Sequence, residues 1–286
     1  MHSALPLSIV CLGWGTIPLV ADEADMAPQV LTFARVVIAA VVLRLLLAAR
    51  REPRARPWRT GGRRAVAAGT VLAGHWTAMF AAYERAPDST VVFLIFLAPI
   101  GVAVIERPSP HLVRASVIGL AGLLLVAGPT VGDADSTTAA GMALALLAAL
   151  LFVVLLVLAK PLAETLGGLR LTFVEMAVAS VLLAPVAGLS SWEGIGNAWP
   201  WLALLGVVHT ALGTAVYLRT LALVPATAVG VLGYLEPVGV VAFAWILAGD
   251  EPSLATIIGA AVVVVAGAMA ATGSTGRSEV AADVPW

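Results

Sequence analysis

The chain alternates between long apolar segments and short polar connections. Each segment of about 20 apolar residues is long enough to cross the hydrocarbon of a bilayer as a helix. None shows the alternation of polar and apolar positions that marks the strand of a membrane barrel. The pattern therefore predicts an all-α membrane protein with ten transmembrane helices. The predicted spans are 3–21, 29–49, 64–84, 88–105, 111–128, 138–159, 169–187, 199–220, 226–248 and 253–272.

Composition supports this fold class and excludes several kinds of chemistry. Hydrophobic residues make up 60% of the 286 residues and charged residues 12%, about half the charged share of a soluble domain. Cys11 is the only cysteine, which excludes an intrachain disulfide and a cysteine metal cluster. The sequence contains neither a HExxH motif nor a P-loop. We therefore expect no metal, no cofactor and no enzymatic activity.

Basic residues mark one side of the predicted bundle. With the N-terminus in the cytoplasm, thirteen Lys and Arg residues fall in cytoplasmic connections and only Arg85 falls outside. The connections on the other side are acidic. Cytoplasmic connections carry the excess of Lys and Arg, so both termini are predicted to be cytoplasmic. The arginine run between the second and third spans is an orientation signal by this argument, rather than a nucleic-acid site.

The two halves of the chain resemble each other. Leu31 to Arg35 is repeated at an offset of 140 as Leu171 to Glu175, and Pro99-Ile-Gly101 at an offset of 138 as Pro237-Val-Gly239. Five helices is an odd number, so the second copy lies upside down relative to the first. This predicts two inverted repeats, an arrangement of many secondary transporters. The predicted domains are 1–130, 138–272 and a mobile cytoplasmic tail, 273–286.

The chain resembles the EamA-type carriers of the drug/metabolite transporter superfamily. The resemblance is carried by the ten spans in two repeats together with several short motifs: Trp14-Gly15, Arg35, Ala98-Pro99, Glu236-Pro237 and Gly249-Asp250-Glu251. It implies export of amino acids or other small metabolites across a bacterial inner membrane. Glu175 departs from the pattern expected of the family, in which that position of the second repeat is more often polar or neutral.

Arg35 and Glu175 occupy equivalent places in the two repeats. An ionisable group inside a span costs about 2.5–3.5 kcal/mol at the helix centre, so it normally faces a cavity or a partner. An inverted two-fold axis could bring the two side chains together at the bundle centre. Arg35 would then hold a substrate carboxylate and Glu175 an ammonium group or a proton, or the two would form a structural ion pair between the halves. Arg35 could instead snorkel outward, since it lies only about two turns into its span.

Glu236 lies deep in the ninth span, directly before Pro237. A proline inside a helix removes one hydrogen bond and kinks the axis. Pro237 and the aligned Pro99 are therefore predicted hinges. Glu236 could bind substrate, take up a proton, or serve as a structural carboxylate.

Histidines and aromatic residues complete the predicted substrate site. His75 and His209 lie in corresponding helices and could relay protons, although a histidine in such a helix is more often a packing residue. Amphipathic rings that could line a cavity are those of Trp14, Trp76, Tyr217 and Tyr234.

Small residues at four-residue spacing mark the fifth and tenth spans. They include Ala115 and Gly119 in the fifth span and Ala255 and Gly259 in the tenth. Such spacing allows close helix packing, either within the chain or in a homodimer.

The leading functional interpretation is a secondary carrier that exports a small metabolite, such as an amino acid, by alternating access. Its partners would be the lipid bilayer, the substrate and, in a coupled mechanism, protons. The alternative is a uniporter, facilitator or channel, but no sequence typical of a channel filter is present.

Overall fold

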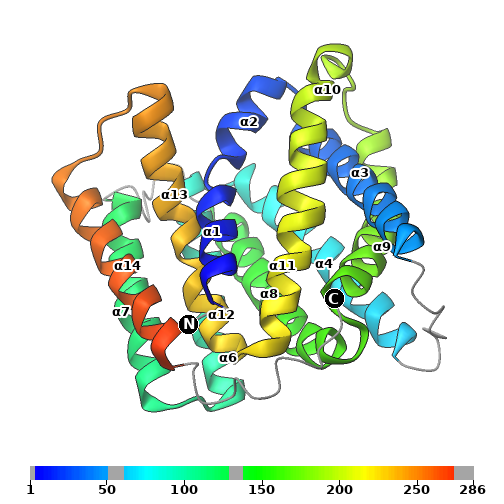
Figure 1. Cartoon of the computed structure of the whole chain (residues 1–286). Coiled ribbons are helices and arrows are strands. Elements are labelled where there is room, and N and C mark those ends of the chain that lie inside the picture. The colour runs from blue at the N-terminus through cyan, green and yellow to red at the C-terminus, as the bar shows by residue number, and fades with distance from the viewer. Residues whose placement is uncertain (1–3, 51–60, 129–137, 274–286) are drawn as a thin grey trace. The chain divides into compact units, whose positions relative to one another are not determined.

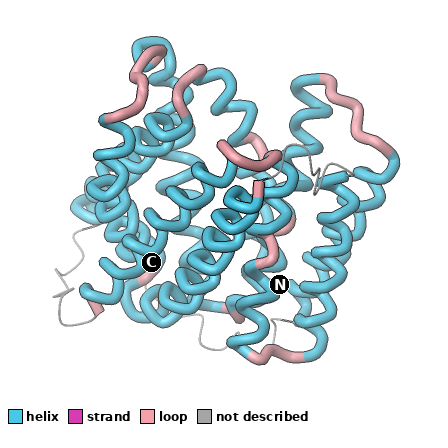
Figure 2. The backbone as a smooth tube through the Cα atoms, turned by 180° about the vertical axis from the view of Figure 1, so that it is seen from behind, coloured by secondary structure: helices cyan, strands magenta, loops and turns pink. Residues whose placement is uncertain are grey.

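The computed structural model describes residues 4–50, 61–128 and 138–273, and every regular element in these ranges is a helix (Figure 2). Nine helical segments among them are long and apolar enough to cross a membrane, and a shorter apolar helix covers Thr90–Glu106. These ten segments match the ten predicted spans. The predicted tail, 273–286, lies outside the described residues beyond Gly273.

Six spans consist of one α-helix each. These are α3 (Pro28–Ala49), α4 (Gly62–Tyr83), α7 (Pro110–Ala127), α8 (Ala139–Leu166), α9 (Gly168–Gly188) and α14 (Leu254–Gly273).

The other four spans are composite. The first contains α1 (Ala4–Trp14) and α2 (Ile17–Ala24), and the fourth contains α5 (Asp88–Ile95) and α6 (Ala98–Glu106). The eighth contains α10 (Ile195–Ala203), the π-helix η2 (Leu204–Gly213) and α11 (Thr214–Leu223). The ninth contains α12 (Ala226–Gly233), α13 (Leu235–Phe243) and the π-helix η3 (Ala244–Ala248).

The chain forms two compact units, and each takes helices from both repeats. The described part of unit 1 is 4–16, 74–128, 138–157 and 224–273, and that of unit 2 is 17–50, 61–73 and 158–223. Unit 1 thus holds spans four and five with their counterparts nine and ten. Unit 2 holds span two with its counterpart seven, and span eight.

Unit 1 is built around close contact between α7 and α14, which run side by side (Figure 1). A Cβ added to Gly122 would lie 2.8 Å from the Gly259 carbonyl oxygen, so only glycine allows this approach. A Cβ added to Gly119 would lie 3.3 Å from the Ala266 Cβ, a looser contact between the same two helices. The predicted small-residue packing of these two spans is therefore present within one chain.

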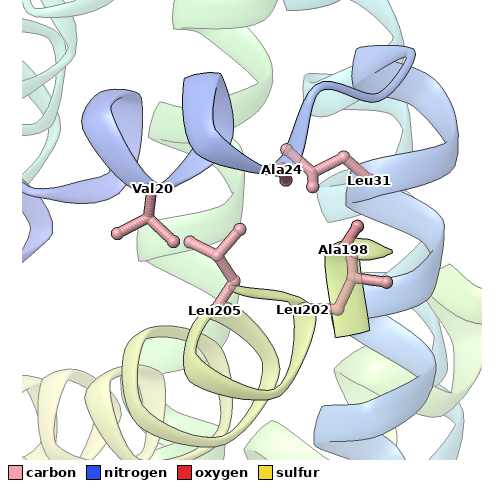
Figure 3. Close-up of a cluster of buried hydrophobic side chains, with 6 residues drawn as sticks. All are labelled: Val20, Ala24, Leu31, Ala198, Leu202 and Leu205. Atoms are coloured by element: carbon pink, nitrogen blue, oxygen red, sulfur yellow. The ribbon is translucent and has the colours of Figure 1, made fainter. Parts of the chain in front are cut away.

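Unit 2 is built around α3, which packs against α9 and η2. A Cβ on Gly206 of η2 would lie 2.6 Å from Ile38 of α3, so this glycine sets the close crossing. A buried aliphatic cluster joins α2, α3, α10 and η2 (Figure 3). Its members are Val20, Ala24, Leu31, Ala198, Leu202 and Leu205.

Candidate functional site

Two spans of unit 1 break at repeat-equivalent places. Pro99 and Pro237 lack the N–H that would bond to the carbonyl four residues earlier, and a helix loses its continuity there. At the first break Leu97 N donates to Leu94 O at 3.2 Å, and at the second Tyr234 N donates to Val231 O at 3.1 Å. Each of these bonds joins residues three apart, whereas the bonds of an α-helix join residues four apart. The predicted kinks are thus helix breaks between α5 and α6 and between α12 and α13.

The two breaks lie against each other. The rings of Phe96 and Tyr234, which are related by the repeat offset of 138, have centroids 5.8 Å apart. On the next turn Gly230 packs on Pro99, where an added Cβ would lie 2.9 Å from the proline Cβ. The discontinuous parts of the fourth and ninth spans therefore form one contact.

A third break reaches the same region from the first span. Between α1 and α2 the chain turns at Gly15 and Thr16, and Gly15 N donates to Leu12 O at 3.0 Å. Gly15 lies against Gly239 of α13, where an added Cβ would come within 2.3 Å of the Gly239 carbonyl carbon. Three broken spans thus converge around residues 234–239.

Glu236 lies between these contacts, in the first turn of α13. It stands ten residues after Ala226, the start of α12, which is about 15 Å of helix. That is half of a hydrocarbon core of roughly 30 Å. The carboxylate acts electrostatically on the Cys11 thiol of α1 and on the Tyr83 hydroxyl of α4. Glu236 is thus a half-buried acidic group near the middle of the span Ala226–Ala248, next to a helix break.

Tyr234 brings a buried polar atom to the same place. Its side chain is 0% exposed, and its hydroxyl has no hydrogen-bond partner among the described residues. Buried hydroxyls are normally bonded, so an unfilled one calls for a partner outside the protein or a structural reason. The ring itself is held over Gly119, where an added Cβ would lie 2.5 Å from Tyr234 Cδ2. The hydroxyl is therefore positioned rigidly.

A carboxylate joins the fourth and ninth spans at one end of their contact. Glu106, the last residue of α6, accepts hydrogen bonds from the first turn of α12. The donors are Ala226 N at 2.9 Å, Thr227 N at 2.9 Å and the Thr227 hydroxyl at 2.8 Å. A negative charge at a helix N-terminus is favourable because the N–H groups there point outward unbonded. We call this arrangement the Glu106 clasp.

Unit 2 contains a fully buried carboxylate. Glu175 of α9 is 2% exposed, and its Oε1 has no hydrogen-bond partner among the described residues. α4 lies close to it, since a Cβ on Gly69 would be 3.1 Å from the Glu175 Cα. Arg35, on the neighbouring helix α3, is half-buried and makes no ion pair with Glu175. The pairing considered from the sequence is not formed.

The two histidines are bonded to backbone. His75 Nδ1 lies 2.9 Å from Ala148 O, and its ring stacks on Phe152 at 5.2 Å. His209 lies within η2, with Nδ1 3.2 Å from Leu204 O. These contacts favour the packing interpretation for His75. For His209, the π-helix is notable because such helices are frequent at functional sites.

The predicted site residues divide between the units. Unit 1 holds Trp14, His75, Trp76, Tyr234 and Glu236 with both prolines, and unit 2 holds Arg35, Glu175, His209 and Tyr217. Among the first group, Tyr234 and Glu236 share one helix break, and Trp14 ends α1 beside Gly15. Trp76 is half-buried in α4 and Tyr217 is buried in α11.

Two elements of the site escaped the sequence analysis. Phe96 could have been found, because it aligns with Tyr234 at the offset that relates the prolines. Glu106 had no such signal, since its partners lie 120 and 121 residues away.

Comparisons with known proteins concern the family and the fold. The model of the EamA-like transporter family matches residues 3–128 and 139–272. None of the curated proteins matches the chain significantly. Among solved structures, a crystal structure of a protein 20% identical in sequence superposes with a TM-score of 0.79. The similarity covers 95% of this chain and 98% of the other. At this identity it shows a shared fold.

Proposed function

Because this chain belongs to the EamA-like transporter family, we propose that it is a secondary carrier working by alternating access. Its cargo would be a small metabolite, such as an amino acid, exported across a bacterial plasma membrane with both termini in the cytoplasm. The convergence of three broken spans around Glu236 and Tyr234 carries this proposal. Discontinuous helices at the bilayer midplane form the substrate sites of many carriers built from inverted repeats.

Each group at the convergence has a task in this mechanism. The Tyr234 hydroxyl, which lacks a partner among the described residues, offers one hydrogen bond to cargo. Glu236 either binds a cationic group of the cargo or takes up a proton. Pro99 and Pro237 are hinges, because the breaks beside them let the two halves of each span tilt independently. Arg35 and Glu175 belong to unit 2 and take no part in this convergence.

The Glu106 clasp distinguishes the two ends of the fourth and ninth spans. With the proposed orientation it lies at the cytoplasmic end, where it joins α6 to α12. At the other end of the ninth span Trp245, Ile246 and Leu247 are exposed. We therefore assign the clasp as a cytoplasmic closure that must open when the site faces inward.

The cargo must be identified before transport can be assayed. We propose to compare metabolites in the medium of cells with and without the protein, and then to measure counterflow of the accumulated compound in proteoliposomes. A carrier gives saturable counterflow. An ion current without saturation would contradict the carrier and favour a channel.

Coupling is tested by Glu236→Gln, which mimics the protonated carboxyl. If Glu236 is the proton site, the variant loses uphill transport driven by a pH gradient and keeps counterflow, because only the protonation step is removed. Glu164 is an exposed carboxylate outside this site. Glu164→Gln is therefore the control and should keep both uphill transport and counterflow. Uphill transport with unchanged pH dependence in Glu236→Gln would exclude the proton role. Loss of counterflow as well would assign Glu236 to cargo binding.

A further inference from the structure

Glu175 is a carboxylate for which the proposed function has no task. Among the residues that the structure describes it is the one buried carboxylate, since the others are half-buried or exposed. Its side chain is 2% exposed, and its Oε1 has no hydrogen-bond partner among these residues. Glu175 lies seven residues after Gly168, the start of α9, which is about 10 Å from the nearer end of the span. The packing of the surrounding helices therefore decides its state.

Three helices of unit 2 pack against the helix that carries Glu175. α9 contacts α3 and α11, and it meets α4 at Gly69. A Cβ added to Gly69 would lie 3.1 Å from the Glu175 Cα and 2.8 Å from the Val178 Cβ, so the two helices touch there. Thr172 and Ala179 share the face of Glu175, three and four residues away, and both are 0% exposed. This face of α9 is therefore part of the packed interior of unit 2.

The side chains in this packing do not stabilise a negative charge on Glu175. The Thr172 hydroxyl donates its one proton to Gly168 O at 2.7 Å. α4 has no titratable residue in 65–74. The titratable side chains of the other helices in this packing are those of Arg170 on α9, Arg35 and Arg44 on α3, and Tyr217 and Arg219 on α11. None of these makes an ion pair with Glu175 or a hydrogen bond to its Oε1.

The ligand that suits such a carboxyl group is a proton. A charge without a counterion is costly in an apolar interior, and the group becomes neutral instead. A proton also needs no free volume. A groove of about 470 Å³ between α4 and α9 is lined by Val174, Ala177 and Val178, among others, but not by Glu175. A molecule in that groove would therefore not reach the carboxyl group.

We propose that Glu175 is a proton-binding site of unit 2, separate from Glu236 in unit 1. The carboxyl group holds its proton while α9 packs against α3 and α4. It transfers the proton to water only when these helices separate far enough for water to hydrate the carboxylate. Proton binding therefore favours the packed form of unit 2, and proton release favours an open form. The site does not depend on the proposed role of Glu236.

The experiment is infrared spectroscopy of the full chain at neutral pH, in a detergent without ester groups. Carboxyl groups in water are ionised at this pH, and the carbonyl stretch of a protonated carboxyl group is separate from the bands of carboxylates and amides. The wild type should show this stretch, and Glu175→Gln should lose it. Glu164→Gln, which removes an exposed carboxylate, is the matched control and should keep it.

Glu236→Gln separates the two carboxyl groups that could carry a proton. If both are protonated, each variant loses its own component of the band. A band that Glu175→Gln leaves unchanged would overturn the proposal. A band lost only in Glu236→Gln would overturn it as well, while leaving the proton role of Glu236 intact. The measurement involves no transport, so its failure and that of the proposed function are distinguishable.

Transfer to heavy water tests the link between the proton and the packing. The band of Glu175 should shift slowly in the wild type, because the side chain is 2% exposed. Gly69→Ala places a Cβ 2.8 Å from Val178. It should speed the exchange about fivefold, which corresponds to about 1 kcal/mol of overpacking relieved on opening. Gly74→Ala is the control in the same helix and should leave the rate unchanged, because its Cβ makes an ordinary contact with Leu151 at 3.6 Å. Equal rates in the two variants, or immediate exchange in the wild type, would overturn the link.

Discussion

Glu175 and Tyr234 each hold a buried side-chain oxygen without a hydrogen-bond partner among the described residues. Burying an unpaired charge is expensive, and removing the charge from a site without a counterion relieves that cost. Glu175→Gln keeps the shape of the side chain. We therefore expect it to leave the thermal unfolding midpoint in detergent unchanged or higher.

A structural ion pair would give the opposite result for Glu175. Breaking a buried pair costs about 3–5 kcal/mol, so a large fall in the midpoint would contradict the geometry at Arg35 and Glu175. In that case, exchanging the two residues would be expected to restore stability. If Glu175 takes part in no ion pair, exchanging the two residues should not restore stability.

The Glu106 clasp makes a second prediction at the residue scale. Glu106→Gln removes the negative charge and replaces one of the two acceptor oxygens with an NH2 group, which cannot accept from the N–H group that it faces, either that of Ala226 or that of Thr227. Hydrogen bonds to a charged group contribute about 1.5–3 kcal/mol each. The variant should lose about that amount of stability in thermal unfolding. Glu164→Gln breaks only an exposed pair at 3.8 Å and should cost under about 0.5 kcal/mol. Equal midpoints for the two variants would show that the clasp does not stabilise the fold.

Helix breaks are the structural feature on which the site depends at the scale of elements. The break at Gly15 is close enough to α13 that an alanine Cβ would overlap the Gly239 backbone. Overpacking of this kind costs about 1–3 kcal/mol. Gly15→Ala should therefore destabilise the protein by that amount. Gly13→Ala, two residues earlier with nothing within 4 Å of the added Cβ, is the control and should have no unfavourable effect. Equal stability of both variants would exclude a close crossing at Gly15.

The sequence predicted these elements unevenly, for physical reasons. Hydropathy located all ten spans, because each must bury about 20 apolar residues in lipid. Prolines located two breaks, since the missing N–H is visible in the sequence. The break at Gly15 carries the same signal, because Pro18 of α2 lacks the N–H that would bond to the Trp14 carbonyl, although no hinge was predicted there. The π-helix Leu204–Gly213 has the same hydropathy as an α-helix, so its existence could not be predicted.

At the scale of the whole molecule, the compact units and the repeats divide the chain differently. Each unit holds corresponding spans from both repeats. The contact of Phe96 with Tyr234, which joins the two repeats, is therefore internal to unit 1. The sequence indicated the equivalence of these residues, but equivalence does not determine which partner each one packs against.

The orientation of the whole chain is tested by thiol labelling in a Cys11→Ala background. Gly196→Cys and Arg64→Cys place exposed thiols near opposite ends of the bundle. The excess of arginine around residue 64 predicts that only Gly196→Cys reacts with an impermeant reagent added outside intact cells. Reversed labelling would contradict both the orientation and the cytoplasmic position of the Glu106 clasp.

The central claim is that the breaks around Glu236 open to one side of the membrane at a time. Gly233→Cys in a Cys11→Ala background places a thiol at the break between α12 and α13, where nothing lies within 4 Å of an added Cβ. Its rate of modification by an impermeant reagent should be measured from each side, with and without Glu106→Gln. The account predicts faster modification from outside in the parent and a shift toward the cytoplasmic side when the clasp is weakened. Equal rates from both sides, unchanged by Glu106→Gln, would contradict alternating access.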